Sequence, residues 1–436
     1  MQADSAQQQG LYRPEFDHDA CGIGALADIN GERHHQILDD ALSILVNLEH
    51  RGGTGLEKNT GDGAGILFQV PHHFFRKEAQ KCGQILPAEG DYGVAMLFFP
   101  QDGKGVEDAR RVFEEGCAEA GVPLLFWREV PVDPHDLGET ARACMPTILQ
   151  AFLGRPDDTP AGDAFERRLY VCRRTIEKKA DAEFALRDKI FYVCSMSSRT
   201  IVYKGMLVAT QMRRFFIDLN DAAVKTAVAL VHSRYSTNTT PSWERAPPNR
   251  FIIHNGEINT LKGNVNWIRA REPNLYSPVL QHDLERVMPI INREGSDSAI
   301  LDNVLEFLVM NGRPLTRAAS MLGPQRQPER GTPRLRRLPV HAHGALGRPG
   351  RHRLYRRSHA GCRPRPQRPA SRPLLCDARR PLYAGKRGGH HRGEPREHPD
   401  ERLSGTGPDA RGRFCPRPRD LQRRAARPLC QGKALP

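Results

Sequence analysis

The hydrophobic residues between positions 21 and 322 follow two spacings. From Ile37 to Leu48 they recur every three or four positions, which predicts an amphipathic helix. From Tyr92 to Phe99 almost every residue is apolar, which predicts a strand in a sheet that is covered on both faces. The same reasoning predicts strands at 21–29, 66–70, 92–99, 122–132, 169–174, 191–203, 227–235 and 251–254, and helices at 37–48, 104–120, 140–153, 208–218, 259–271 and 297–311.

This pattern stops near Leu322, and the tail, residues 323–436, has a different composition. From Met321 onward the sequence has 27 arginines and 2 lysines against 8 acidic residues, so the formal charge of +14 arises in the tail. Proline removes backbone donors and dense like charge opposes collapse. We therefore predict that the tail is disordered and builds no packed core.

Two interpretations of the tail remain open. Binding of nucleic acid through phosphate neutralisation is disfavoured, because aromatic residues on which bases could stack are scarce there. We prefer a frameshift, because a GC-rich gene that is read out of frame yields this mixture of Arg, Pro, Gly, Ala and His. Translation of the underlying DNA in the other two frames from about codon 322 tests this hypothesis.

The remaining composition excludes several classes of protein. The ten cysteines form no Cys-x-x-Cys pair and have no histidine at zinc-finger spacing, so we expect no metal site and reduced thiols. Residues 1–20 lack the basic and apolar regions of a secretory signal, and no run of about 18 apolar residues predicts a membrane span. We therefore expect a cytoplasmic protein that binds neither a membrane nor a specific nucleic acid.

The first candidate for chemistry is Cys21, which lies where a polar leader, residues 1–20, meets the first apolar run. A cysteine at a new N-terminus can use its own α-amine as the base that activates its thiol. An amide nitrogen inside a peptide bond is not basic, so this chemistry requires removal of the leader. We predict that the leader is cleaved before Cys21.

Four other stretches have a specific residue order near a predicted strand or helix end. They are Val231–Thr239 (VHSRYSTNT), Ile253–Asn259 (IHNGEIN), Gly295–Ser298 (GSDS) and the Gly-rich loop 61–65. Each is weak alone, because a strand-end arginine is more often a surface ion pair, Asn-Gly a tight turn and Ser-Asp-Ser a helix cap. The Gly-rich loop lacks the lysine of a phosphate-binding loop, and a tight turn is its favoured interpretation. We assign neither His232 nor His254 a catalytic role.

Together, and in this order, these motifs resemble the class II glutamine amidotransferase domain of the N-terminal-nucleophile type. Three further stretches are similar to the large (alpha) subunit of glutamate synthase. They are Glu49–Gly53 (EHRGG), Thr60–Ile66 (TGDGAGI) and Asn255–Thr260 (NGEINT). The resemblance covers residues 12 to 322, does not extend through the tail, and implies a domain 21–322 that is incomplete at its C-terminal end.

The resemblance implies an α+β fold, a four-layer αββα sandwich of the N-terminal-nucleophile hydrolases. It implies that Cys21 attacks the side-chain amide of L-glutamine and forms a γ-glutamyl thioester, which water hydrolyses to glutamate. Asn255 and Gly256 would form the oxyanion hole, Arg234 would bind the substrate α-carboxylate, and Asp297 would bind the α-ammonium group.

The resemblance also implies what lies outside this chain. In the family, ammonia passes to a synthase domain that carries FMN and an iron–sulfur cluster, where 2-oxoglutarate becomes glutamate. The electrons come from a small (beta) NADPH-oxidising subunit or from ferredoxin, and we expect no cofactor within this chain. Two alternatives remain: another class II amidotransferase, or a non-catalytic, basic-tailed binding protein or inactive fragment.

Overall fold

The computed structural model describes residues 22–54, 57–233, 240–254, 258 and 261–322, together with a two-residue strand at 374–375. Four of the predicted site residues lie outside this part of the chain: Cys21, Arg234, Asn255 and Gly256. The leader and, apart from that short strand, the tail also lie outside it. What the sequence predicts for those segments therefore stays a prediction.

Two antiparallel sheets form the centre of the described chain. The first has the order β1-β8-β2-β7 and consists of β1 (Ile23–Ala27), β8 (Val228–His232), β2 (Ala64–Gln69) and β7 (Thr200–Gly205). The second has the order β4-β5-β3-β6 and consists of β4 (Leu124–Glu129), β5 (Thr147–Gly154), β3 (Tyr92–Phe99) and β6 (Tyr192–Ser197). A short strand, β9 (Ile252–Ile253), pairs with β10 (Leu374–Leu375).

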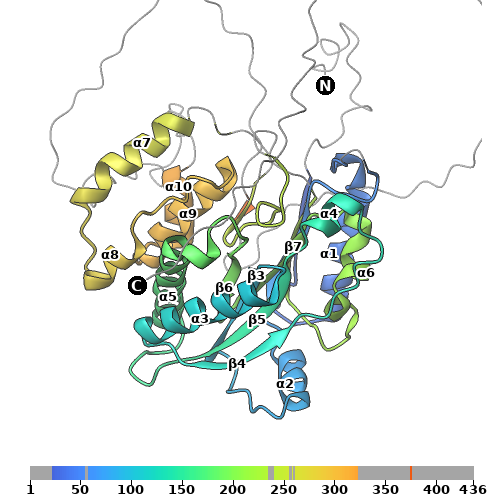
Figure 1. The fold of residues 1–436 in the computed structure, drawn as a ribbon, viewed down its shortest axis with the longest axis horizontal. Coiled ribbons are helices and arrows are strands. Elements are labelled where there is room, and N and C mark those ends of the chain that lie inside the picture. The colour runs from blue at the N-terminus through green and yellow to red at the C-terminus, as the bar shows by residue number, and fades with distance from the viewer. Residues whose placement is uncertain are drawn as a thin grey trace, which may run out of the picture. The chain divides into compact units, whose positions relative to one another are not determined.

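Helices pack on both sheets (Figure 1). Helices α3 (Gly103–Ala120) and α5 (Asp163–Ala182) cover one face of the second sheet, and α1 (His35–Asn47) packs on β1 and β8. Helix α9 (Asp297–Met310) packs on α5. This arrangement confirms the predicted α+β sandwich. The other helices are α2 (His72–Lys81), α4 (Glu139–Ala143), α6 (Met212–Phe215), α7 (Leu261–Arg271), α8 (Leu284–Val287) and α10 (Leu315–Leu322).

Strand β3 joins two hydrophobic cores, and all of its residues are buried. Val94, Met96 and Phe98 share a core with the first sheet and α1. The alternate residues of β3 face the opposite way and pack against α3 and α5. The prediction that this apolar strand is covered on both faces is confirmed, because successive side chains of a strand point to opposite faces.

The predicted strand at 169–174 is wrong, since these residues lie in the middle of helix α5. Leu169 and Cys172 face the core that α3 shares with the second sheet, whereas Tyr170 and Val171 face the core around α9. Because residues 169–172 are buried on two sides of the helix, this short stretch is apolar without a break, as in a buried strand.

The predicted helix at 140–153 is also wrong, because α4 ends at Ala143 and strand β5 begins at Thr147. Pro146 explains the break, since the residue before a proline disfavours the helical conformation. The predicted strand at 191–203 is two strands, β6 and β7, and the predicted helix at 208–218 contains the short α6 between 3-10 turns. The sequence did not predict α2, whose helical face buries only Phe74, Phe75 and Ala79.

Candidate functional site

Asp297, the predicted site residue that the structure describes, lies in the first turn of α9. Ser296 caps this helix, and its Oγ accepts a hydrogen bond from the N–H of Ala299 at 3.2 Å, as the sequence predicted. Asp297 is buried, and its Oδ1 accepts from the N–H of Ser298 at 2.7 Å. Its Oδ2 accepts from the N–H of Ile258 at 3.2 Å. The carboxylate therefore lies beside the segment that carries Asn255 and Gly256.

A second contact holds the other end of that segment to α9. The Nδ1 atom of His254 lies 3.0 Å from the Oγ atom of Ser298. Burial lowers the pKa of His254, although the nearby carboxylate of Asp297 opposes this shift. The contact with Ser298 ties the His254 ring to the first turn of α9. Residues 254 and 258, on either side of Asn255 and Gly256, are thus both tied to the start of α9.

The strands that lead to Cys21 and Arg234 lie side by side. Ile23 of β1 is paired with His232 of β8, and the carbonyl oxygen of Gly22 accepts from the N–H of Ser233 at 2.8 Å. In the sequence, Cys21 directly precedes Gly22 and Arg234 directly follows Ser233. The residues next to Cys21 and Arg234 are therefore hydrogen bonded to each other.

The third strand that leads to a predicted site residue packs on the same sheet. Ile253, two residues before Asn255, is fully buried in a small cluster with Leu230 of β8, and Ile23 of β1 packs against this cluster. The approaches to Cys21, Arg234 and Asn255 are therefore in contact with one another. Local sequence does not reveal this contact, because the first and last of the three segments are more than 200 residues apart in the chain.

The Gly-rich loop has a more specific role than the tight turn that the sequence favoured. A Cβ atom at Gly61 would lie 2.2 Å from the carbonyl carbon and oxygen of Leu207, and one at Gly53 would lie 1.7 Å from Oδ2 of Asp62. Residue 62 also donates its N–H to the carbonyl oxygen of Gly53 at 2.9 Å. Glycine is required at position 61 because the backbone of Leu207 approaches closely, and at position 53 because the side chain of Asp62 fills the space of a Cβ atom.

The same loop region lies against the end of β8. A Cβ atom at Gly52 would lie 3.3 Å from the carbonyl oxygen of Ser233, and the Oγ of Ser233 donates to the carbonyl oxygen of Leu48 at 3.3 Å. The stretch 49–53 and the Gly-rich loop therefore support the end of the strand that leads to Arg234. The sequence suggested these motifs as markers of a family, but it did not reveal this contact.

The comparison with protein families decides what kind of site this is. The model of the class II glutamine amidotransferases matches residues 21–334. The chain belongs to the class II glutamine amidotransferases. The resemblance inferred from the motifs is thereby confirmed.

Known relatives of this amidotransferase are glutamate synthases. It is 48% identical over 321 residues to the glutamate synthase (NADPH) large chain of Bacillus subtilis strain 168, covering 73% of this chain and 20% of that protein. It is 43% identical over 324 residues to the glutamate synthase (NADH) of Saccharomyces cerevisiae, covering 73% and 15%. It is 40% identical over 306 residues to the chloroplastic ferredoxin-dependent glutamate synthase of Oryza sativa subsp. japonica, covering 70% and 19%. The chain spans at most about a fifth of the length of these relatives.

Two further features of the amidotransferase bear on the site. Among the residues that the structure describes, no three His, Cys, Asp or Glu side chains are grouped so that they could hold a metal ion. Within the same part of the chain, none of the helices has the length and apolar character needed to cross a membrane.

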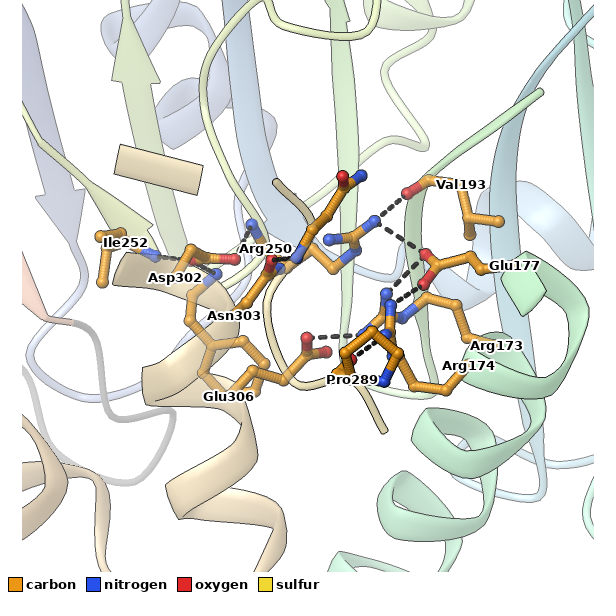
Figure 2. A network of polar contacts seen from close by, with 12 residues as sticks. Arg173, Arg174, Glu177, Val193, Arg250, Ile252, Pro289, Asp302, Asn303 and Glu306 are labelled. Carbon is orange, nitrogen blue, oxygen red and sulfur yellow. Dashed lines mark hydrogen bonds and ion pairs between the residues drawn. The ribbon is translucent and has the colours of Figure 1, made fainter. Parts of the chain in front are cut away.

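The amidotransferase also has a buried polar cluster that the sequence did not suggest, centred on Asp302 of α9 (Figure 2). Asp302 is fully buried; its Oδ1 accepts from the N–H groups of Phe251 at 2.8 Å and Ile252 at 2.9 Å, and its Oδ2 accepts from the N–H of Arg250 at 3.2 Å. Burial raises the pKa of Asp302 to about 6, and Glu306 adds to the rise. The Arg250 guanidinium and the backbone N–H groups oppose it.

The cluster continues to Glu177 of α5. Arg173 bonds Glu177 at 2.6 Å and Glu306 at 2.6 Å, and Arg174 and Arg250 also pair with Glu177. Burial favours a higher pKa, but the three guanidinium groups outweigh it and lower the pKa of Glu177 to about 2. Asp302 and Glu306 lie four residues apart in a largely apolar stretch of α9, and this spacing is the sequence signal that could have pointed to the cluster.

Proposed function

We propose that this chain hydrolyses L-glutamine to glutamate and ammonia, with Cys21 as the N-terminal nucleophile. The observation that carries the proposal is the convergence of the segments next to the predicted residues. The neighbours of Cys21 and Arg234 share a hydrogen bond, Ile253 packs on the same two strands, and Asp297 bonds residue 258. The family match begins at residue 21, which supports removal of residues 1–20.

The proposed reaction needs a nucleophile, a base and donors for the oxyanion. The α-amine of Cys21 takes the proton of the thiol, the thiolate attacks the δ-carbonyl carbon of glutamine, and the α-amine passes the proton to the departing ammonia. α-Amino groups of model peptides have pKa values of about 8, which suits such a base. The side-chain amide of Asn255 and the N–H of Gly256 donate to the oxyanion. Water then hydrolyses the γ-glutamyl thioester, which releases glutamate and restores the thiol.

The proposed substrate contacts use Arg234 and Asp297. Arg234 pairs with the α-carboxylate through two parallel N–H donors. Asp297 accepts from the α-ammonium group. In the structure its Oδ1 accepts from the N–H and Oγ of Ser298 and its Oδ2 accepts from the N–H of Ile258, and this position of the carboxylate beside the segment 254–258 supports the assignment.

We propose that the ammonia serves the synthesis of glutamate, because the relatives reported above are named glutamate synthases. In that assignment, 2-oxoglutarate accepts the ammonia in an FMN and iron–sulfur domain of the longer protein. A small NADPH-oxidising subunit or ferredoxin supplies the electrons. The domain limits 21–322 belong to the same proposal, and the family match to residue 334 is compatible with them within 12 residues.

The test compares Cys21→Ala with Cys82→Ala, which removes an exposed cysteine at the end of α2. We expect Cys21→Ala to abolish the release of ammonia from glutamine, and Cys82→Ala to keep it. The wild-type protein should begin at Cys21 when its N-terminus is sequenced, and an electrophilic glutamine analogue should label that residue. Glutaminase activity that survives Cys21→Ala, or that occurs with the leader intact, would refute the assignment.

A further inference from the structure

The segment that leads into Asn255 and Gly256 is held by a helix as well as by its pairing with β10. Three consecutive N–H groups, those of residues 250, 251 and 252, all donate to the carboxylate of Asp302. One side chain therefore accepts hydrogen bonds from the two residues before β9 and from the first residue of β9. Figure 2 shows Asp302 on α9 facing this backbone.

Helix α9 holds the same segment at two further points. Ser298 contacts the ring of His254, and Asp297 accepts the N–H of Ile258. Residues 297 and 298 lie in the first turn of α9, and residue 302 lies about one turn later, because a turn of α-helix takes 3.6 residues. The helix thus contacts the segment before, within and after β9.

The side chain of Arg250 attaches the same segment to β6 and α5. Its guanidinium donates to the carbonyl oxygen of Val193 in β6 and pairs with Glu177 of α5 at 3.4 Å. Glu306, one turn beyond Asp302 on α9, is tied to α5 through Arg173. Asp302 is therefore held in a framework that joins α9 and α5 and has little freedom to move relative to the second sheet.

We propose that Asp302 is a positioning residue for the oxyanion hole. Its carboxylate accepts the N–H groups of residues 250–252 and so fixes the position of this backbone. We propose that this in turn positions Asn255 and Gly256, which follow in the sequence. It does not touch the substrate. This inference rests on the proposed glutaminase function, because it assigns a role within the same reaction.

The chemistry of the carboxylate explains why this residue type is needed. An ionised carboxylate only accepts hydrogen bonds and has about four acceptor positions, so it can serve three N–H groups. An asparagine in its place keeps one acceptor oxygen for Phe251 and Ile252 but presents an NH₂ group to the N–H of Arg250. An alanine leaves all three donors without this acceptor in a buried place, where that is costly.

The experiment uses the full chain with Asp302→Asn and Asp302→Ala, and Asn303→Ala as the matched control. Asn303 is the next residue on α9, is also buried, and also accepts one backbone N–H, that of Asn292 at 3.1 Å. Its partner segment does not lead to the oxyanion hole. Asn303→Ala therefore reports the loss of a buried hydrogen bond on the same helix without displacing residues 250–254.

We expect Asp302→Ala to lower kcat by about 100-fold, the effect of a displacement of about 1 Å at a catalytic group, and to leave KM for glutamine nearly unchanged. Asp302→Asn should lower kcat less than Asp302→Ala, and Asn303→Ala should leave kcat near the wild-type value. Equal kcat losses in the Asp302 variants and Asn303→Ala would overturn the proposal. So would a higher KM with unchanged kcat.

Amide hydrogen exchange separates this proposal from the proposed function. The amides of residues 250–252 should lose protection in Asp302→Asn, whereas those in the middle of α9 should keep it. If the wild-type protein with Cys21 at its N-terminus releases no ammonia, the proposed function fails and the positioning role fails with it. In that case loss of exchange protection assigns Asp302 a purely structural role. If glutaminase activity is present and protection at 250–252 is unchanged, only the role of Asp302 is refuted.

Discussion

The ion pair between Arg128 and Asp218 offers a sharp test of the buried polar architecture. Arg128 lies in β4, and its two terminal nitrogens bond the two oxygens of Asp218 at 2.8 and 2.7 Å. Both side chains are almost fully buried, with 6% and 3% of their surface exposed. The hydroxyl of Tyr203 in β7 also donates to Asp218 at 2.8 Å. Through Tyr203, the pair therefore links β4 of the second sheet to β7 of the first.

We expect Asp218→Ala to lower the free energy of unfolding by about 3–5 kcal/mol, since it leaves a buried guanidinium without its bidentate partner. Glu78 and Gln150 still contact Arg128, at 2.8 and 2.9 Å, which favours the lower end of that range. Replacing both partners, with Arg128→Met and Asp218→Leu together, should recover part of the loss, because the buried guanidinium is removed and Glu78 keeps its ion pair with Lys81.

Urea unfolding followed by far-ultraviolet circular dichroism measures the effect. The control is Asp136→Ala, which removes the exposed pair between Asp136 and Arg214, with 45% and 64% of their side chains accessible. That change should cost less than about 1 kcal/mol. If Asp218→Ala costs no more than Asp136→Ala, the buried pair does not stabilise the fold in the way proposed here.

Three further predictions concern single positions. Ser296→Ala should lower the free energy of unfolding by about 1 kcal/mol through loss of the α9 cap, measured by the same urea titration; an unchanged midpoint would contradict the cap. Gly61→Ala should cost about 1–3 kcal/mol because its Cβ would overlap the Leu207 backbone, whereas Gly103→Ala, with nothing within 4 Å, should cost far less; similar losses would argue against the close approach. Asp302→Asn should remove a pH dependence of stability: the folded pKa of about 6 lies above the ordinary 3.8, so the folded state binds the proton first, and this group raises the free energy of unfolding as the pH falls from about 7 to about 4. Urea midpoints of both proteins across that range measure it, and a constant difference between them would refute the prediction.

Much of the fold could be predicted from local patterns. Helix α3 and helix α9 were expected within one residue of their observed limits, and β3 was expected with its observed limits. Helix α3 has a buried face and an exposed face, so its apolar residues repeat with the helical period. Helix α5 was missed, because its residues 169–172 are buried between two cores and form an apolar run without the helical period.

For the candidate site, too, the sequence predicted one part and the structure added another. The sequence determined which residue types carry the proposed chemistry and their order along the chain, from Cys21 through Arg234, Asn255 and Gly256 to Asp297. Motif order survives in the sequence because each motif is local. The structure added that the described neighbours of these residues meet at one end of the first sheet and at the start of α9.

Only the tertiary structure decided how the segment before Asn255 is held. The acceptors for its N–H groups come from Asp302, which lies about 50 residues later and looks in sequence like an ordinary polar position on a helix. A strand normally finds its acceptors in a neighbouring strand, and the period of the sequence reports which side chains are buried. It does not report which distant group satisfies a buried N–H, because that depends on packing between elements.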